Sequence, residues 1–260
     1  MINSAEAKQI ENAVREAGGI ILSEHPDKGS IRKKEGPANY VTLYDVKIQE
    51  FLIEKFSALF PDAGFYGEED TEGNSHRVGE GYTFFIDPID GTTNFMFDYH
   101  NSCVSVGLSE GNTMIAGWVY NPYVDQMFSA LRGQGAYLNG KKLKIENRSM
   151  GEGIVAFGCA RYNEGDLVFS VLEEIFMNSL SLRNGGSAAI DLCRIAAGSN
   201  VAYIEMKLQP YDYAAASVII EEAGGFVGQA DGSPVAIDGP CSIVAGTYKA
   251  AEEIRGILSR

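Results

Sequence analysis

The sequence DPIDGTTNF, at residues 87–95, directly follows the apolar run YTFFI at residues 82–86. The run is short, aromatic and β-branched, which is typical of a strand buried on both faces. Asp87 and Asp90 are therefore predicted where this strand ends, on a turn that Pro88 stiffens. Carboxylates at such a place suit a divalent cation, because Mg²⁺ and Ca²⁺ prefer hard oxygen ligands. The segment thus predicts a cation site at a strand end.

The residues after Asp90 add a place for a phosphate. Gly91 lets the backbone approach a ligand closely, and Thr92 and Thr93 are predicted to begin a short helix. The free N–H groups at a helix N-terminus bind phosphate readily. An Asp-rich turn would explain the same letters, since DP and DG are common turn dipeptides. Other segments of the chain must decide between a ligand site and an ordinary turn.

Length and charge limit the class of protein. At 260 residues and 45% hydrophobic, the chain can bury a substantial core, as one large domain or as two closely packed halves. Its formal net charge is −14, from 21 Lys and Arg against 35 Asp and Glu. This balance argues against nucleic-acid binding, which depends on clustered Lys and Arg. An anionic substrate would have to be reached through bound metal, whose charge offsets the carboxylates.

The cysteines and the N-terminus indicate a cellular compartment. Cys103, Cys159, Cys193 and Cys241 are widely spaced and form no zinc-binding pattern, so they are expected to be buried thiols in a reducing compartment. The N-terminal residues begin an amphipathic helix and lack the basic and apolar regions of a signal peptide. No apolar run is long enough to span a membrane. These features predict a cytoplasmic protein that does not enter a membrane.

Hydrophobic periodicity divides the chain into two halves, residues 1–150 and 151–260. In the first half it predicts one helix with an apolar face from residue 10 to 21, another from 48 to 59, and a solvated loop over residues 26–40. Closely spaced strands follow, and their short connections require antiparallel pairing. These strands are predicted over residues 103–108, 114–120, 126–131 and 136–138.

The second half alternates strands with helices, which indicates a mixed sheet between helices. Its strands are predicted over residues 154–158, 180–183, 201–205, 226–228 and 242–246, and its helices over residues 167–177, 187–197 and 213–223.

Four blocks of the sequence together resemble the inositol monophosphatase family of Mg²⁺-dependent, lithium-sensitive phosphatases. They are PANYVTLYD ending at Asp45, GEE at residues 67–69, DPIDGTTNF at residues 87–95, and YDYAAASVIIEEAGG at residues 211–225. The blocks occur in the family's order, and the similarity spans nearly the whole chain. The resemblance implies an α-β-α-β-α sandwich, with an antiparallel sheet in the N-terminal half and a mixed sheet in the C-terminal half. It also implies a homodimer with each active site where the two halves meet. Residues 1–150 would then carry most metal ligands, and residues 151–260 would complete the substrate and metal site.

The resemblance also assigns the metal site and the attacking water. It implies two or three Mg²⁺ ions held by Glu68, Asp87, Asp90, Asp212 and the Ile89 carbonyl. Asp45 and Thr92 match the carboxylate and hydroxyl that take a proton from metal-bound water, and Glu69 is a further catalytic group beside the metal. Asp45 has a second interpretation, because Thr42-Leu43-Tyr44-Asp45 fits the spacing of a helix capping box.

Two helix N-termini and one glutamate are implied to bind the substrate. The residues assigned in this way are Asp90, Gly91, Thr92, Thr93, Gly186, Ser187, Ala188, Glu205 and Asp212, together with Lys34. Glu205 matches an acid that accepts a hydrogen bond from an inositol hydroxyl, whereas a glutamate at a strand end is otherwise usually only solvated. Lys34 matches a loop lysine near the metal site, or is a solvated charge in a basic run.

These assignments predict Mg²⁺-dependent hydrolysis of a small phosphate monoester by metal-activated water, with inositol monophosphate as the favoured substrate. One alternative is a sugar bisphosphatase or nucleotide 3′-phosphatase of the same superfamily; another is a metal-dependent regulatory protein with weak activity. The chain departs from the family's pattern at Tyr211, usually Trp, at Ala216, often Gly, and over residues 96–101. These departures leave the metal ligands intact and concern the rim of the substrate pocket.

Overall fold

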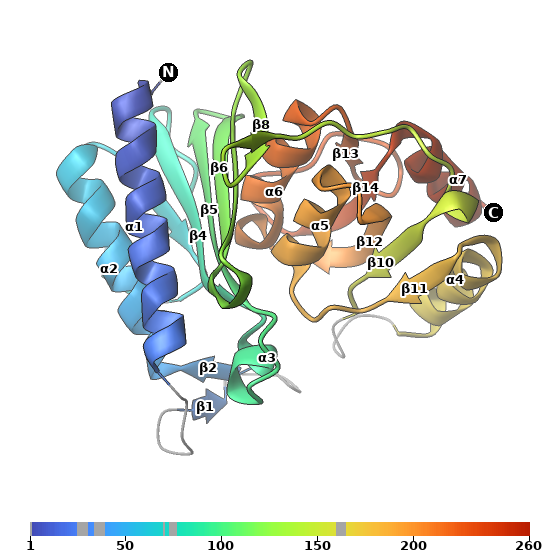
Figure 1. The fold of residues 1–260 in the computed structure, drawn as a ribbon, viewed down its shortest axis with the longest axis horizontal. Helices are drawn as coiled ribbons and strands as arrows, with labels where there is room; N and C mark the ends of the chain where they lie inside the picture. The colour runs from blue at the N-terminus through green and yellow to red at the C-terminus, as the bar shows by residue number, and fades with distance from the viewer. Residues whose placement is uncertain (1, 25–30, 34–39, 70, 73–76, 160–164) are drawn as a thin grey trace.

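The computed structural model has five layers, in the order helices, sheet, helices, sheet, helices (Figure 1). It describes residues 2–24, 31–33, 40–69, 71–72, 77–159 and 165–260. The helices of the three helical layers are, in turn, α1 (Ser4–Ser23) with α2 (Leu43–Leu59), α5 (Ala188–Ala196) with α6 (Pro210–Glu222), and α4 (Gly165–Asn178) with α7 (Tyr248–Leu258). The predicted layered sandwich is confirmed, although α7 was not predicted from the sequence.

The first sheet has seven strands that follow one another in chain order. They are β3 (Gly64–Gly67), β4 (Tyr82–Asp90), β5 (Cys103–Glu110), β6 (Thr113–Asn121), β7 (Gln126–Leu131), β8 (Gly135–Leu138) and β9 (Lys141–Lys142). From β4 onward the neighbours pair antiparallel, which confirms the pairing predicted for β5 to β8. The edge strand β3 instead pairs parallel with β4, because the connection between them is long enough for a crossover.

The second sheet has five strands in the order β11-β10-β12-β14-β13, and it is mixed as predicted. Strands β10, β11 and β12 are parallel, whereas β14 pairs antiparallel with β12 and β13. The bounds are β10 (Ile154–Phe157), β11 (Ser181–Arg183), β12 (Asn200–Leu208), β13 (Phe226–Gly228) and β14 (Cys241–Gly246).

Two local predictions are wrong. The solvated loop predicted over residues 26–40 contains the short strand β1 (Ile31–Lys33) and the first residue of β2 (Tyr40–Thr42), because these two segments pair antiparallel with each other. Strand β4 does not end before Asp87 but continues to Asp90. A shift in register between these two residues allows pairing with β5 to resume after the interruption by Pro88.

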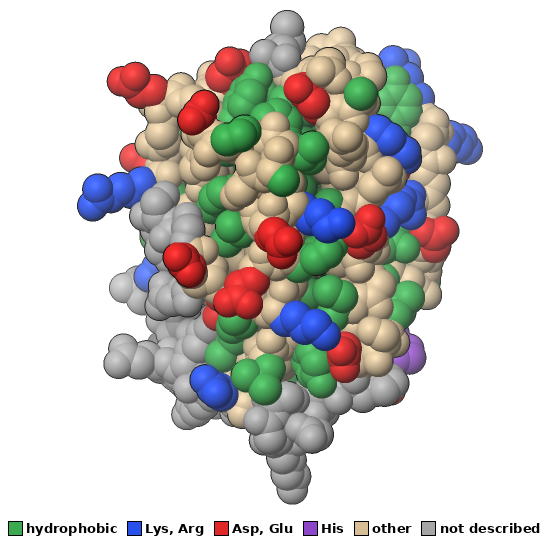
Figure 2. Space-filling model, turned by 90° about the vertical axis from the view of Figure 1, so that its left-hand side faces the viewer, with side chains coloured by type: hydrophobic (Ala, Val, Ile, Leu, Met, Phe, Trp, Pro, Cys, Tyr) green, Lys and Arg blue, Asp and Glu red, His purple; other side chains and the backbone are tan. Residues whose placement is uncertain are grey.

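The outer face formed by α1 and α2 carries acidic and basic side chains interspersed with apolar ones (Figure 2). Lys55 of α2 pairs with Glu16 of α1 at 3.1 Å. Helix α1 continues through its two adjacent glycines, as predicted, and turns Gly18 toward the ring of Tyr120. Within the described ranges, none of the helices combines the length and the apolar character needed to cross a bilayer.

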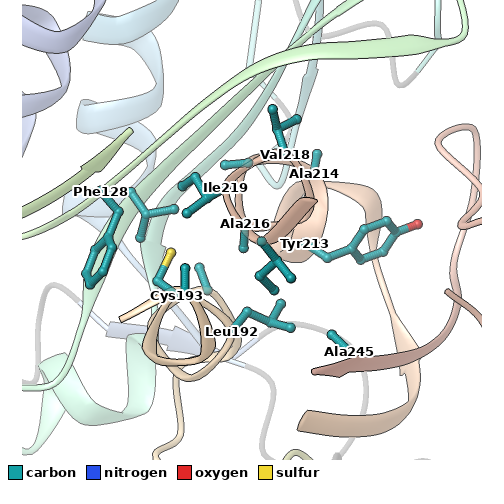
Figure 3. Close-up of a cluster of buried hydrophobic side chains, with 14 of the residues drawn as sticks. Phe128, Leu192, Cys193, Tyr213, Ala214, Ala216, Val218, Ile219 and Ala245 are labelled. Carbon is teal, nitrogen blue, oxygen red and sulfur yellow. The ribbon is translucent and has the colours of Figure 1, made fainter. Parts of the chain in front are cut away.

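The middle helices pack closely against the first sheet. Figure 3 shows side chains of α5 and α6 meeting Phe128 of β7 and Ala245 of β14 in one buried cluster. A Cβ on Gly107 would lie 2.9 Å from the Cβ of Ala214, and a Cβ on Gly117 would overlap the backbone of Ala215. These glycines therefore set the distance between α6, which carries Asp212, and the sheet that carries Asp87 and Asp90.

We expect Gly117→Ala to lower the free energy of unfolding by about 1–3 kcal/mol, because the added methyl group forces α6 away from the sheet. The matched control is Gly19→Ala in α1, where a Cβ meets nothing within 4 Å. That change should stabilise the protein by roughly 0.5–1 kcal/mol through helix propensity. Urea unfolding of both variants measures the difference, and equal effects would show that Gly117 does not control the contact.

Candidate active site

Parallel pairing of β3 with β4 brings the GEE segment beside the acidic end of β4. Gly67 pairs with Ile86, and the Glu68 N–H donates to the Ile86 carbonyl oxygen at 3.0 Å. Glu68 is thereby level with Asp87, the next residue of β4. Two acidic segments that are separate in the sequence thus become neighbours through one strand pair.

Gln49 of α2 fixes the backbone of Glu69. Its Nε2 donates to the Glu69 carbonyl oxygen at 2.6 Å, and its Oε1 accepts from the Glu69 N–H at 2.9 Å. A side chain on Gly67 would overlap this glutamine. Carboxylate oxygens of Asp45, Glu68 and Glu69 consequently lie within 4.8 Å of one another, in an arrangement able to hold a metal ion. This role of Gln49 could not be predicted from the sequence, because a lone glutamine is not typical of a metal site.

Asp45 has both contacts that its two interpretations require. Its Oδ2 accepts hydrogen bonds from the N–H and hydroxyl of Thr42, at 2.8 and 2.5 Å, and completes the capping box of α2. Its Oδ1 accepts from the Thr92 hydroxyl at 3.3 Å. Thr92 begins α3 (Thr92–Met96), the short helix predicted after Gly91. Because the two oxygens have different partners, capping of α2 leaves Asp45 able to act with Thr92.

Asp90 connects the two halves of the molecule. Its Oδ2 accepts from the Ser187 hydroxyl at 2.5 Å and from the Ala189 N–H at 2.7 Å, while its Oδ1 accepts from the Ala188 N–H at 3.3 Å. These donors belong to the N-terminus of α5, whose dipole favours a negative charge at this place. The helix N-terminus predicted to contact substrate therefore also holds a predicted metal ligand.

Asp212 reaches the site from the first turn of α6. Its Oδ2 accepts from the Gln209 N–H at 2.8 Å, in a capping box that the sequence analysis did not predict. The neighbouring Tyr211, which departs from the family's usual Trp, packs its ring 6.4 Å from that of Tyr66. Burial, followed by the charges of Glu68 and Asp212, raises the pKa of the Tyr211 hydroxyl, so this side chain packs on the core and also interacts with the carboxylates of the site.

Burial and mutual repulsion raise the pKa values of the central carboxylates. Burial raises the pKa of Asp87 well above its usual range, and the nearby carboxylates, Glu68 first among them, raise it further. The pKa of Asp212 is raised in the same way, by burial and then by Asp90 and Glu68. Burial raises the pKa of Asp90 to about 6, although its hydrogen bonds to α5 lower it.

A divalent cation fits this donor set. Buried carboxylates that repel one another require either protons or a compensating cation. The predicted ligands offer carboxylate and carbonyl oxygens, which are the hard donors that Mg²⁺ prefers. The Ile89 carbonyl oxygen lies 3.2 Å from the Thr92 hydroxyl, whose single proton can be directed either to this oxygen or to Asp45. The residues present therefore suit Mg²⁺ in their chemistry and in their electrostatics.

A cavity of about 280 Å³ lies where the two halves meet. The predicted residues that line it are Asp90, Thr93, Gly186, Ser187, Ala188, Glu205 and Asp212. It is also lined by Gly158, Asp191 and Tyr203, which the sequence analysis did not single out. Lys34 lies outside the described residues.

Glu205 lies inside β12, not at the strand end that the sequence predicted. The strand continues to Leu208, and Glu205 pairs with Ile243 of β14. Its side chain is only 8% exposed, which excludes a freely solvated charge. Burial raises the pKa of Glu205 to about 7, although the hydrogen bond from Tyr203 lowers it.

Two asparagines fix the chain that leads into α5. Asn94 and Asn101 both donate to the Gly185 carbonyl oxygen at 2.8 Å. The Gly185 N–H in turn donates to Asp191 at 2.9 Å. Gly91, between β4 and α3, has a φ of 90°, which favours glycine. Asn94 belongs to the DPIDGTTNF segment, but its partner in the other half could not be found from sequence spacing.

Comparison with known proteins gives a consistent result along the whole chain. A model of the "Inositol monophosphatase family" matches residues 3–259. The chain is 34% identical to the "Inositol-1-monophosphatase" of Bacillus subtilis, over 95% of this chain and 94% of that protein. It is 36% identical to the "Fructose-1,6-bisphosphatase/inositol-1-monophosphatase" of Aquifex aeolicus, over 80% of each. The solved structure of the extragenic suppressor protein suhB from Bartonella henselae is similar, with a TM-score of 0.90, 30% identity and 99% coverage of both chains.

We expect Asp87→Asn to stabilise the metal-free protein and to abolish stabilisation by Mg²⁺. Since folding raises the pKa of Asp87, its ionisation costs stability as pH rises from the unfolded value, about 4, through the folded one. In a chelator, the wild type should therefore lose more stability than the variant as pH is raised. Added Mg²⁺ should restore the wild type only. Urea unfolding at several pH values, with chelator or Mg²⁺, measures both effects.

The control for this prediction is Asp62→Asn, which changes an exposed aspartate. It should keep the pH dependence and the Mg²⁺ stabilisation of the wild type. If Asp87→Asn behaved like this control, Asp87 would not belong to a crowded cation site.

Proposed function

Since this chain belongs to the inositol monophosphatase family, we propose that it hydrolyses the phosphate monoester of a small polyol, inositol monophosphate above all. The family makes the chain a phosphoric monoester hydrolase. The observation that carries the proposal is the meeting of buried carboxylates from both halves beside a cavity that also contains Glu205. A metal-dependent regulatory protein with weak activity would have no need for this complete and costly set of buried charges.

We assign the metal-binding role to Glu68, Asp87, Asp90, Asp212 and the Ile89 carbonyl. Two or three Mg²⁺ ions held there would neutralise the phosphate and lower the pKa of a water molecule. The protein's own part is to keep these oxygens crowded and largely buried, with the side chain of Asp90 fixed by α5. Glu69 is assigned to the same region, since its carboxylate lies within 4.8 Å of those of Asp45 and Glu68.

Asp45 and Thr92 form the proton acceptor for the attacking water. When the single proton of the Thr92 hydroxyl is directed to Asp45 rather than to the Ile89 carbonyl, the Thr92 oxygen can accept a proton from water while its own proton moves to the carboxylate. The capping contacts of Asp45 to Thr42 hold the carboxylate in one orientation. Positioning of this kind is what makes a general base effective.

The substrate would lie across the two halves. The N–H groups of Gly91, Thr92 and Thr93 are assigned to the phosphate. Gly186, Ser187 and Ala188 line the cavity next to Asp90 and are assigned to the polyol, together with Glu205 as the acceptor of one hydroxyl. Lys34 is assigned to the phosphate side from the sequence alone.

A sugar bisphosphatase is the second candidate function, because the Aquifex aeolicus relative carries both names. Among the described residues that line the cavity, four are acidic and none is Lys, Arg or His. A second phosphate would therefore face negative charge, which favours a substrate with one phosphate. We further propose, from the family resemblance, that the enzyme is inhibited by lithium, forms a homodimer and acts in the cytoplasm.

We expect Asp45→Asn to lower kcat by about 10²–10⁴-fold, because the amide cannot accept the proton that Thr92 passes on. The fold should be nearly as stable as the wild type, since an amide oxygen can still accept from the Thr42 N–H at the start of α2. Phosphate release and urea unfolding, measured on one preparation, separate the two roles. If the variant lost activity only to the extent that its fold was destabilised, Asp45 would act only in the capping box of α2.

We expect Glu205→Leu to weaken transition-state binding of inositol 1-phosphate by about 1–3 kcal/mol, measured as a lower kcat/KM, because a polyol hydroxyl loses its acceptor. A minimal aryl phosphate should be affected at least about tenfold less. Glu205→Gln, which retains an acceptor, should fall between Leu and the wild type. In the wild type, KM for the polyol should decrease as pH rises through about 7, where Glu205 ionises, and Glu205→Gln should lack this change. Equal losses on both substrates would contradict a hydroxyl-binding role.

A further inference from the structure

Tyr203 and Glu205 lie on the same face of β12, because alternate residues of a strand point to the same side. The Tyr203 hydroxyl donates to Glu205 Oε2 at 2.5 Å, and both residues line the cavity. Ile204, between them, points to the opposite side and packs in the core shared with α4 and α7. Tyr203 is 1% exposed, so its ring is fixed by packing and its hydroxyl has a defined position.

Gly158 closes the same corner of the cavity. It follows β10, and its N–H donates to the Ile204 carbonyl oxygen at 3.0 Å, which brings its backbone against Glu205. A Cβ on Gly158 would overlap the Glu205 carboxylate and lie 2.5 Å from the Tyr203 hydroxyl. The absence of a side chain at this position is therefore required for the pair to have its present arrangement.

The two oxygens of Glu205 are consequently not equivalent. Oε2 is engaged by Tyr203. Among the described residues, Oε1 has no hydrogen-bond partner. It is also not one of the fully buried polar atoms without a partner, so it is accessible from the cavity side. Since Glu205 lines the cavity, this oxygen is open to a ligand there.

We propose that Tyr203, supported by Gly158, is a positioning residue that determines selectivity for the polyol part of the substrate. By holding Oε2, it directs Oε1 toward one ring hydroxyl, so a substrate with a hydroxyl in that direction is preferred. The inference deepens the proposed function and rests on it. Tyr203 makes no contact with the phosphate in this account and acts only through Glu205.

Tyr203→Phe tests the inference, because it removes only the hydroxyl. For inositol 1-phosphate we expect KM to rise about 5–10-fold, the effect of one lost hydrogen bond, with kcat within about twofold of the wild type. For 4-nitrophenyl phosphate neither constant should change. The matched control is Tyr120→Phe, which removes a hydroxyl that donates to Asp125 at 3.1 Å, on β6 and away from the cavity. This control should leave both substrates unaffected.

Two further variants distinguish positioning from structural support. Gly158→Ala should reproduce the rise in KM for inositol 1-phosphate, because its methyl group displaces the Glu205 carboxylate. In a Glu205→Leu background, Tyr203→Phe should add no further loss, since its partner is already gone. Urea unfolding of each variant shows whether the fold is retained.

An additive loss in the double variant, or equal losses on the two substrates, would overturn the positioning role of Tyr203. So would an unchanged KM for inositol 1-phosphate in Tyr203→Phe. A wild type that releases phosphate from neither substrate in the presence of Mg²⁺ would overturn the proposed function, and the inference with it. A wild type that hydrolyses both, with a silent Tyr203→Phe variant, would leave the function standing and refute the inference alone.

Discussion

The burial of several carboxylates in one place is the constraint on which the rest of the structure depends. Asp87 comes from the first half and Asp212 from the second, and the charge of Asp212 is among the causes that raise the pKa of Asp87. Such charges cost free energy unless donors or a cation compensate them. The fold supplies N–H and O–H donors to Asp45 and Asp90, and Mg²⁺ is the cation that the family implies for the cluster as a whole.

Three helices direct their N-termini toward this region, and one of the acids contacts each N-terminus. Asp45 and Asp212 are the N3 residues of the capping boxes of α2 and α6, and Asp90 accepts from the first N–H groups of α5. The same side chains therefore stabilise helices and form the site, because an anion at a helix N-terminus is favourable. This double use explains how the chain holds its acids in fixed orientations within a layered sandwich.

The sequence allowed most of the fold and the carboxylates to be predicted, because strand and helix periodicity is strong and DPIDGTTNF is distinctive. Prediction from the sequence failed where a feature depends on contact with residues that are distant in the sequence. The continuation of β4 through Pro88 depends on pairing with β5, and the burial of Glu205 depends on β14 and the cavity. Gln49 and Tyr203 act on acids they reach only through the fold, so no local pattern indicated them.

The central claim is that acids from both halves hold divalent cations together. Anomalous X-ray diffraction from crystals soaked in Mn²⁺, which substitutes for Mg²⁺ with similar oxygen ligands, tests it most directly. The account predicts two or three anomalous peaks bounded by Glu68, Asp87, Asp90 and Asp212. A structure with no peak in this region, or with a peak contacted by acids of the first half alone, would contradict it.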